Sequence, residues 1–334
     1  MASITTRNTL GTAAEAPPFP SEPAIEISGL RKVYGGKVAV EDLTLDVEAG
    51  EVFGFLGPNG AGKTTSVKML MGLIRPTSGS ARLLGKPLGN LGARSKIGFL
   101  PELFRFHEWL TGAELLDLHG RLYGMSGSER RRRIPEVLEL IGLAAARDQQ
   151  IRTYSKGMQQ RIGLGQALIN NPRLVFLDEP TSALDPLGRR DVRSIIVKLR
   201  EQGITVFLNS HLLSEVESVC DRVAIINHGM VVATGRLEDL LQASLTVEMR
   251  LGACGPDLLE SLGRVLAVHE VRASERTLVV AQASDEGEIA KAVDLIVAAG
   301  VPVYGVTPER RSLEDLFIKV IADETAGHAD GTVR

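Results

Sequence analysis

The sequence predicts an α/β fold built on a mostly parallel β-sheet, followed by a smaller α+β domain. Apolar strand patterns alternate with helical patterns, and polar side chains directly follow the apolar runs at 174–177 and 204–208. This alternation is typical of a parallel sheet that helices cover on both faces. Near Ser244 the pattern changes to short alternating strands around helical segments, which indicates that a second domain begins there.

Two strand patterns open the ordered part of the chain. Residues 24–27 alternate between apolar and polar side chains as an edge strand does, and residues 41–47 alternate again. The pair Gly35-Gly36 marks a turn between them. Tyr34 stands just before this turn, where its ring either stacks on a nucleotide base or is an ordinary strand aromatic. The residues alone leave both interpretations open.

The glycine-rich loop at 57–65 is the most informative segment. It connects an apolar strand pattern at 51–56 with a helical pattern at 66–73. This is the G-x-x-x-x-G-K-[ST] motif in the strand–loop–helix context that a phosphate-binding loop requires, and a chance match in a glycine-rich turn is the alternative. The glycines let the backbone approach an anion, and N–H groups and the helix N-terminus attract negative charge.

The loop therefore predicts binding of a nucleoside triphosphate. Lys63 is expected to reach the β- and γ-phosphates, and the Thr64 hydroxyl to bind Mg²⁺. The residues expected to bind the nucleotide here are Gly57, Pro58, Asn59, Gly60, Ala61, Gly62, Lys63, Thr64 and Thr65.

The middle of the chain is predicted to be mainly helical. Strands at 80–84 and 97–100 precede a helical pattern over 111–143. A basic run begins at Ser128, which we expect to cap an exposed helix start. Four arginines without interleaved aromatic residues are a weak signal for nucleic-acid binding. Ser155 is expected to cap the next helix.

The candidate catalytic residues follow two apolar strands. Asp178 and Glu179 follow the strand at 174–177, and His211 ends the segment after 204–208. Ligands of such sheets bind at the carboxyl ends of the strands. We expect Asp178 to hold Mg²⁺, Glu179 to act as general base for a water molecule, and His211 to contact the γ-phosphate. A structural Asp-Glu pair and a structural histidine are the alternatives.

The second domain has the β-α-β-β-α-β order of a split βαβ fold. The expected elements are strands at 245–251, 265–268, 277–280 and 301–306 and helices at 256–262, 286–299 and 312–321. This segment carries no paired carboxylates, metal cluster or nucleophile with a base. Its expected role is binding or dimerisation.

Composition and net charge restrict the class of protein and the partners that we expect. The 334 residues are 44% hydrophobic and 24% charged, as in a globular protein of one large or two ordinary domains. A net charge of −3 gives no electrostatic case for nucleic acid. No run approaches the ~20 apolar residues of a membrane span. Residues 1–23 and 323–334 are expected to be disordered tails.

By these residues the chain resembles the ATP-binding-cassette (ABC) transporter ATPases over about residues 25–236, with the family's motifs in the family's order. The matching segments are 57–65 (Walker A), Pro101-Glu102 (Q-loop), 154–160 (signature), 174–179 (Walker B), 182–185 (D-loop) and His211 (switch histidine). The Leu-Pro-Glu at the Q-loop and the tail domain are similar to the ATPase subunits of drug, antibiotic and polysaccharide exporters.

The resemblance implies a P-loop NTPase ABC cassette at 24–240, with N-terminal antiparallel strands and a helical subdomain at about 103–170, and an accessory domain at 244–322. It implies ATP and Mg²⁺ as cofactors and hydrolysis coupled to transport. The implied partners are separate transmembrane permease subunits and a second copy or a paralogous cassette, with no nucleic acid. The implied location is the cytoplasmic face of the membrane.

The resemblance also assigns further site residues. Tyr34 matches the aromatic that stacks on adenine, and Ser155 and Gly157 match residues that touch the γ-phosphate bound by the other cassette. Glu102 is implied to contact nucleotide and Mg²⁺, and Asp185 to belong to the nucleotide site.

Two departures from the family pattern bear on rate and coupling. Glu102 replaces the usual glutamine, so it offers an oxygen ligand but donates no hydrogen bond unless protonated. The signature reads Tyr-Ser-Lys-Gly-Met, and Lys156 either adds positive charge near the phosphates or faces solvent.

Two other functions are the alternatives to a transporter subunit. One is a soluble ABC ATPase acting on nucleic acid or ribosomes, and the other is a weakly hydrolysing nucleotide-dependent binding module.

Overall fold

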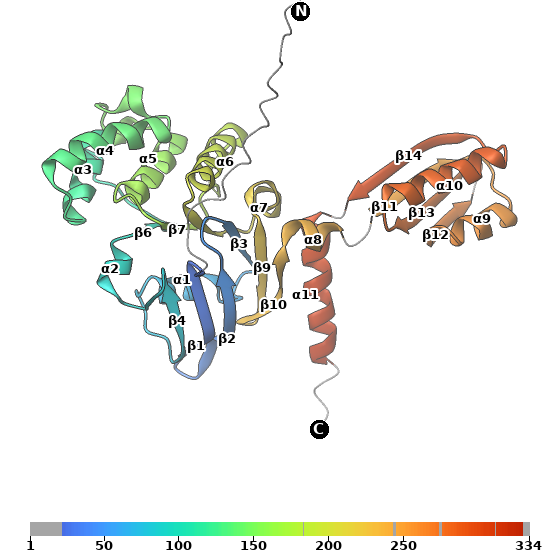
Figure 1. Ribbon diagram of the computed structural model, residues 1–334, viewed down its shortest axis with the longest axis horizontal. Coiled ribbons are helices and arrows are strands. Elements are labelled where there is room, and N and C mark those ends of the chain that lie inside the picture. Colours follow the sequence, from blue (N-terminus) through green and yellow to red (C-terminus); the bar gives the residue numbers. More distant parts are fainter. Residues whose placement is uncertain (1–21, 183, 243–244, 274–275, 311, 330–334) are drawn as a thin grey trace, which may run out of the picture.

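The structure is a computed structural model that describes residues 22–182, 184–242, 245–273, 276–310 and 312–329 (Figure 1). These residues form a large ten-stranded sheet with helices around it and a separate four-stranded sheet. The expected N-terminal tail lies, up to residue 21, outside the described residues. No helix in the described ranges combines the length and the hydropathy needed to cross a bilayer.

Five parallel strands form one half of the large sheet, in the order β9-β3-β8-β7-β6. Their bounds are β3 (Val52–Leu56), β6 (Ile97–Leu100), β7 (Leu174–Asp178), β8 (Thr205–Asn209) and β9 (Arg222–Asn227). The sequence predicted all five as apolar runs, β9 from the run at 223–226. Because parallel strands are buried on both faces, continuous apolar runs are their expected pattern.

The other half of the sheet is largely antiparallel, which agrees with the fold that the resemblance implied. It comprises β1 (Ile25–Tyr34), β2 (Lys37–Val47), β4 (Ser78–Leu83), β5 (Lys86–Pro87) and β10 (Met230–Arg236). Strand β10 joins the halves, since it pairs antiparallel with β9 and parallel with β2. The sequence did not predict β5 and β10: the first is very short, and the second is only partly buried.

Side chains of the parallel strands alternate between two hydrophobic clusters, one on each face of the sheet. On one face Phe53, Phe55, Phe176 and Phe207 pack together, with ring centroids 5.2–5.8 Å apart. Helix α1 (Lys63–Leu70) belongs to this face. Helices α6 (Pro186–Glu201) and α7 (Leu213–Val219) supply side chains to the cluster on the opposite face.

A helical lobe stands beside the sheet (Figure 1). It contains α3 (Gly112–Leu122), α4 (Gly127–Leu140), the one-turn 3₁₀ helices η1 (Ala144–Ala146) and η2 (Ile151–Thr153), and α5 (Lys156–Leu168), and the short α2 (Leu91–Arg94) precedes it. The prediction that Ser128 caps α4 is wrong. Ser126 is the cap, because it forms a reciprocal capping box with Glu129.

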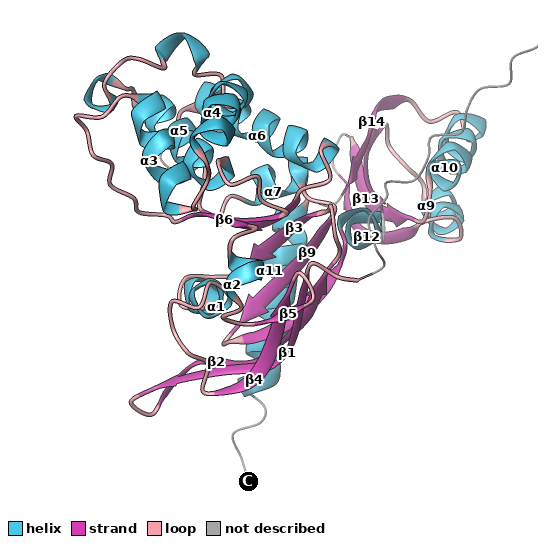
Figure 2. Ribbon diagram, turned by 60° about the vertical axis from the view of Figure 1, so that its left-hand side comes forward, coloured by secondary structure: helices cyan, strands magenta, loops and turns pink. Residues whose placement is uncertain are grey.

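The small sheet has the order β12-β13-β11-β14, all antiparallel. Its elements are β11 (Leu245–Leu251), α9 (Pro256–Gly263), β12 (Ala267–Ala273), β13 (Thr277–Ala283), α10 (Glu286–Ala298) and β14 (Val303–Arg310). The predicted β-α-β-β-α-β order is present. Figure 2, turned from the view of Figure 1, shows α9 and α10 beside this sheet, away from the helical lobe.

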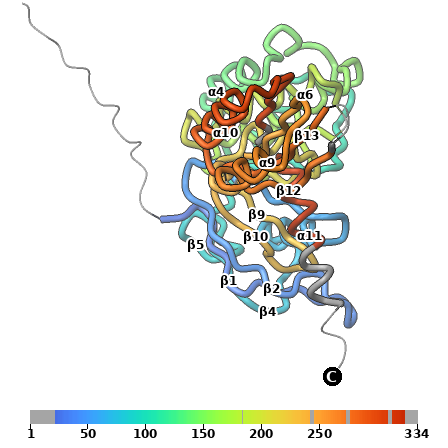
Figure 3. Tube along the Cα trace, turned by 90° about the vertical axis from the view of Figure 1, so that its right-hand side faces the viewer, coloured from blue at the N-terminus to red at the C-terminus, as the bar shows by residue number. Residues whose placement is uncertain are grey.

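The terminal helix corrects two expectations. α11 (Leu313–Ala329) continues through residues that we expected to belong to a disordered tail beginning at 323. It also packs on the cassette and not on the small sheet: Leu313 is fully buried in a cluster shared with α6 and α7. The small sheet is thus inserted between α8 (Leu237–Gln242) and α11, and Figure 3 shows α11 running down beside β9 and β10.

Candidate functional site

The glycine-rich loop connects β3 to α1. Gly60 and Gly62 have φ angles of +84° and +101°, a region that favours glycine. A Cβ atom at Gly62 would lie 2.5 Å from the carbonyl oxygen of Ala39, and one at Gly57 would lie 2.3 Å from that of Ile226. The loop backbone therefore packs directly against neighbouring strands, and larger residues do not fit there.

Lys63 begins α1, and its ammonium group lies inside the loop. Nζ donates to the carbonyl oxygens of Gly57 at 2.6 Å and Pro58 at 3.3 Å. Burial lowers the pKa of Lys63, while the carboxylates of Glu179 and Asp178 favour its charged form. A buried ammonium group at a helix N-terminus is suited to bind phosphate oxygens.

Asp178 and Asn209 end the neighbouring strands β7 and β8, where they are paired in register. The Asn209 side-chain amide donates to Asp178 Oδ1. Burial raises the pKa of Asp178, and the hydrogen bond from Asn209 opposes this shift. The Asn209 Oδ1 atom is buried and has no hydrogen-bond partner.

Glu179 and His211 are joined by a hydrogen bond of 2.7 Å between Oε2 and Nδ1. The Glu179 side chain is 9% exposed, whereas the His211 ring is 52% exposed. Burial raises the pKa of Glu179, and the bond to His211 opposes the rise. Glu179 also has a φ of +52°, an uncommon conformation for a residue with a Cβ atom.

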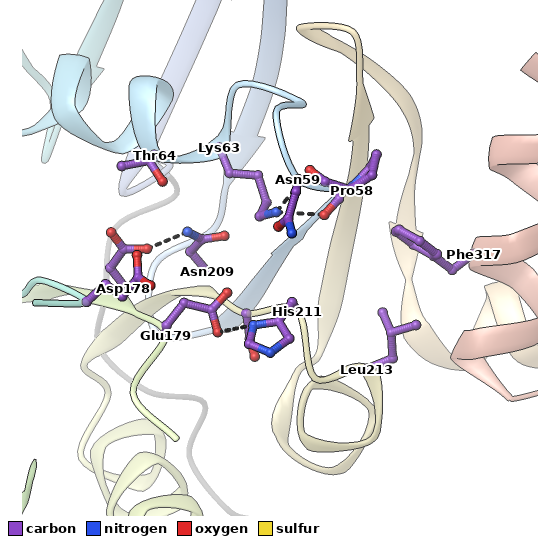
Figure 4. A pocket seen from close by; sticks show the side chains of 13 residues that line it. Pro58, Asn59, Lys63, Thr64, Asp178, Glu179, Asn209, His211, Leu213 and Phe317 are labelled. Atoms are coloured by element: carbon purple, nitrogen blue, oxygen red, sulfur yellow. Dashed lines mark hydrogen bonds and ion pairs between the residues drawn. The ribbon is translucent and has the colours of Figure 1, made fainter. Parts of the chain in front are cut away.

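These residues line one pocket of about 450 Å³ at the carboxyl ends of the parallel strands. Figure 4 shows Lys63, from the start of α1, and Asp178, Glu179 and His211, from the ends of β7 and β8, extending into the same space. The sheet order β3-β8-β7-β6 places the segments after these strands side by side. The pocket can therefore hold a phosphate chain between an ammonium group and a buried carboxylate.

A magnesium ion fits this pocket only together with a nucleotide. Thr64, Glu102 and Asp178 line it, and they supply a hydroxyl group and two carboxylates. Among the described residues, no three or more His, Cys, Asp or Glu side chains form a group that could hold a metal ion. Protein-bound Mg²⁺ usually has one or two carboxylate ligands and completes its shell with substrate phosphates and water. The donor set agrees with that pattern.

Ser155, Gly157 and Asp185 lie together in a different pocket, of about 390 Å³. Lys156 and Arg161 line it as well, so it holds two positive side chains. None of these residues lines the pocket of the glycine-rich loop. Ser155, Gly157 and Asp185 are therefore separated, within one chain, from the site residues that line the pocket of the glycine-rich loop.

Helix starts build this second pocket. Ser155 is the N-cap of α5, as predicted, and its Oγ accepts from the Met158 N–H at 3.3 Å. Asp185 is the N-cap of α6, and its Oδ1 accepts from the Gly188 N–H at 2.8 Å. Of the predicted D-loop, residue 183 lies outside the described residues.

Tyr34 ends β1 and lines neither pocket. Its ring is 47% exposed, and the Lys32 ammonium group lies 4.8 Å from the ring centroid. Lys37, paired with Tyr34 across the hairpin, lines a further pocket with the glycine-rich loop. The ring is thus open to a stacking ligand beside the loop, without contacting it.

Sequence reasoning missed Lys37, Asn209, Leu213 and Phe317, which line these pockets. Asn209 could have been found, because it occupies the same strand-end position as Asp178. Phe317 could not, because it comes from α11 and no local pattern connects that helix to the phosphate loop.

Comparisons with known proteins agree with this geometry. The ABC transporter family model matches residues 40–182. An uncharacterised ABC transporter ATP-binding protein of Synechocystis is 41% identical over 93% of this chain and 88% of its own length. The daunorubicin/doxorubicin resistance ATP-binding protein DrrA of Streptomyces peucetius is 37% identical over 88% of this chain and 91% of its own. The bacitracin transport ATP-binding protein BcrA of Bacillus licheniformis is 34% identical over 91% and 99%.

Solved structures match about two thirds of this chain. An ATP-binding subunit of an ABC transporter shows 32% identity and a TM-score of 0.59, over 65% of this chain and 91% of its own. The dimeric cassette MJ0796, bound to ADP and Pi after hydrolysis, shows 28% identity and a TM-score of 0.58, over 64% and 98%. The chain belongs to the ABC transporter ATP-binding proteins and is an ATP-binding ATPase subunit of this class.

Proposed function

We propose that this chain hydrolyses ATP as one half of a cassette dimer and thereby drives an exporter whose transmembrane subunits are separate chains. The single observation that supports a dimer is that expected site residues line two separate pockets of one chain. The phosphate loop, Glu179 and His211 line one pocket, whereas Ser155 and Gly157 line another. Facing two copies head to tail brings each loop opposite the other chain's Ser155, as in a two-fold symmetric assembly.

Each side chain then has a defined role. Lys63 binds the β- and γ-phosphates, and Glu179 accepts a proton from the attacking water molecule. His211 is held by Glu179 and donates toward the γ-phosphate. Thr64, Asp178 and Glu102 would hold Mg²⁺, which would offset the negative charge of the phosphates.

Groups farther from the reacting phosphate complete the proposed site. Tyr34 stacks on adenine from the open side of the hairpin. Ser155 and Gly157 bind the γ-phosphate held by the partner chain, and Lys156 adds positive charge at that place. Asp185 fixes the start of α6 beside them, through its bond to Gly188.

A second surface supports docking of a transmembrane partner. The segment after β6 exposes Leu103 and Trp109, at 88% and 67% of their areas, next to Glu102. A further pocket of about 290 Å³ lies nearby in the sequence, lined by residues from α1, α2 and α3, among them Leu122 and Tyr123. Exposed apolar groups of this kind mark interaction sites. A helix of a permease is the proposed occupant, which would place the chain at the cytoplasmic face of the membrane.

The export direction rests on relatives. The names of DrrA and BcrA describe drug resistance and bacitracin transport, and both relatives span the accessory sheet as well as the cassette. We carry export of a drug or antibiotic to this chain as part of the proposal.

A subunit-mixing experiment tests the composite site. We expect Lys63→Ala and Gly157→Asp each to abolish ATP hydrolysis, because one removes the phosphate ligand and the other blocks the partner's surface. A mixture of the two variants should regain activity, because each mixed dimer holds one intact site. After random exchange about half of the dimers are mixed, so about a quarter of all sites are intact. A mixture as inactive as its components would overturn the proposal, because it would mean that each site lies within one chain.

A second experiment tests the permease. The tagged full-length chain is isolated from membranes of its source, with Leu103→Glu/Trp109→Glu as the matched variant. We expect an integral membrane protein to co-purify with the wild-type chain and to be lost with the variant, whose ATP binding should be unchanged. Recovery of ribosomes or nucleic acid, in a salt-sensitive manner, would favour the soluble alternative.

A further inference from the structure

Helix α11 carries a continuous apolar stripe that faces the cassette. The stripe recurs with the spacing of one helix face. Leu313 is fully buried in the cassette core, and the other members pack against that core: Leu316, Phe317, Val320 and Ile321. Ile318, on the opposite side, is 59% exposed. The helix is therefore docked on the cassette, although the accessory sheet precedes it in the chain.

The start of α11 is fixed to α7. The Leu313 N–H donates to Glu217 Oε2 of α7 at 3.0 Å. Ser312 and Asp315 close the first turn, because the Ser312 N–H donates to the Asp315 carboxylate at 3.0 Å and the Asp315 N–H to Ser312 Oγ at 3.2 Å. The free N–H groups of a helix start are thus satisfied partly by a side chain of α7.

Helix α7 follows the candidate switch histidine directly. It begins at Leu213, two residues after His211, and spans only seven residues. A helix this short is marginal alone and depends on its packing. On its inner side Val216 is fully buried, and a Cβ atom at Gly54 of β3 would lie 2.7 Å from the Val216 side chain. On its outer side α11 supplies the support, so α7 is held between β3 and α11.

Phe317 extends this support into the nucleotide pocket. Phe317 and Leu213 both line the pocket that contains Lys63, Glu179 and His211. Figure 4 shows the two apolar side chains together on the wall beyond His211. The ring of His211 is half exposed and is tied to Glu179 by one hydrogen bond. The orientation of such a side chain depends on the segment that carries it.

We infer that Phe317 of α11 is a positioning residue for His211. The inference rests on the proposed role of His211. Phe317 packs at the start of α7 and holds the His211 segment so that its ring reaches both Glu179 and the γ-phosphate.

A double-mutant cycle tests the positioning role in the full chain. We expect Phe317→Ala to lower kcat for ATP hydrolysis about tenfold and to leave KM within about twofold, because Phe317 does not line the pocket that Lys37 and the glycine-rich loop form beside Tyr34. Phe317→Leu should retain most activity, and Ile318→Ala, the matched change on the exposed face, should retain all of it. In the His211→Ala background, Phe317→Ala should have no further effect.

Two results would overturn the inference. The first is a wild-type kcat in Phe317→Ala. The second is that Phe317→Ala lowers kcat by the same factor in the His211→Ala background as in the wild-type background, since Phe317 would then act independently of His211. If His211→Ala retains full turnover, the proposed role of His211 fails, and the positioning role fails with it. If His211→Ala loses turnover, the proposed role of His211 stands, and the Phe317 variants decide the positioning role.

A measurement without turnover separates positioning from general destabilisation. The ¹⁵N signals of the His211 ring, identified by their loss in His211→Ala, report the bond to Glu179. We expect these signals to move in Phe317→Ala and to stay in place in Ile318→Ala, with both variants folded by circular dichroism. Unmoved signals in Phe317→Ala would contradict the inference.

Discussion

Glu179 Oε2 and His211 Nδ1 form a hydrogen bond of 2.7 Å, although the two residues follow different strands. The contact arises because β7 and β8 are parallel neighbours whose carboxyl ends coincide. The left-handed backbone of Glu179, with φ +52°, turns its side chain out of the strand line. Uncommon backbone conformations of this kind are held in place where function requires them.

We predict that Glu179→Gln stops hydrolysis and stabilises an ATP-bound dimer. The amide keeps the size of the side chain but cannot accept the proton of the attacking water molecule, so turnover should fall at least about 100-fold. Phosphate release measures the loss, and light scattering with and without ATP measures the dimer. Undiminished phosphate release would remove Glu179 from the role of general base.

Turnover should decline toward acidic pH at values above the ordinary range of glutamate. A general base must be deprotonated, and burial raises the pKa of Glu179. The hydrogen bond from His211 opposes that rise, so the acidic limb of the kcat profile should move to higher pH in His211→Ala. A limb that stays in place would show that another group controls it. The profile is measured at saturating ATP, with circular dichroism at each pH.

Gly62→Ala should impair ATP binding more than Gly60→Ala. Both positions have positive φ, which costs about 1–2 kcal/mol for a residue with a Cβ atom. Only at Gly62 does the added atom also collide with the Ala39 carbonyl oxygen, whereas nothing lies within 4 Å at Gly60. Isothermal titration with ATP measures the two losses. Equal affinities in the two variants would mean that the contact with Ala39 does not hold the loop.

Local signals predicted much of the cassette. The loop at 57–65 and the strand β7 are defined by residues adjacent in sequence, and both lie where the pattern indicated. The helix cap Ser155 was predicted for the same reason. The cap Ser128 was assigned incorrectly because two serines compete, and Glu129 decides for Ser126 through the capping box.

Long-range packing explains what the sequence could not predict. The helical pattern of α11 was recognised, but its apolar stripe does not state which surface it covers, and only the structure places Leu313 in the cassette core. The contribution of Phe317 to the nucleotide pocket is hidden for the same reason. The short or half-exposed strands β5 and β10 carry too weak a pattern to be separated from loops.

The place of α11 in the cassette can be measured by stability. We predict that Leu313→Ala lowers the free energy of unfolding of the cassette by about 2–5 kcal/mol, because the side chain is fully buried. Ile318→Ala, on the exposed face of the same helix, should change it by less than about 0.5 kcal/mol. Denaturant unfolding, followed by the fluorescence of Trp109 in the cassette segment between β6 and α3, reports the cassette. Equal stability of both variants would show that α11 is not part of this cooperative unit.

The raised pKa of Glu51 predicts that the folded protein loses stability as the pH rises. Its carboxylate accepts from the Glu48 N–H at 2.8 Å and lies 3.2 Å from Arg222, yet burial raises its pKa from 4.5 to about 7. The folded state therefore binds this proton more tightly than the unfolded state, so stability is greatest below the unfolded pKa and falls as the pH rises toward 7.

Glu51→Gln should remove this pH dependence. Compared with wild type, the variant should gain up to about 3 kcal/mol in relative stability between about pH 5 and pH 8, because the glutamine has no proton to lose. The amide oxygen can still accept from Glu48, and Arg222 keeps the carboxylates of Asp46 and Glu48. Urea unfolding at several pH values measures the difference, with Glu238→Gln, a carboxylate on the surface helix α8, as the control. A constant difference between Glu51→Gln and wild type across this range would mean that Glu51 is ionised throughout in the folded state.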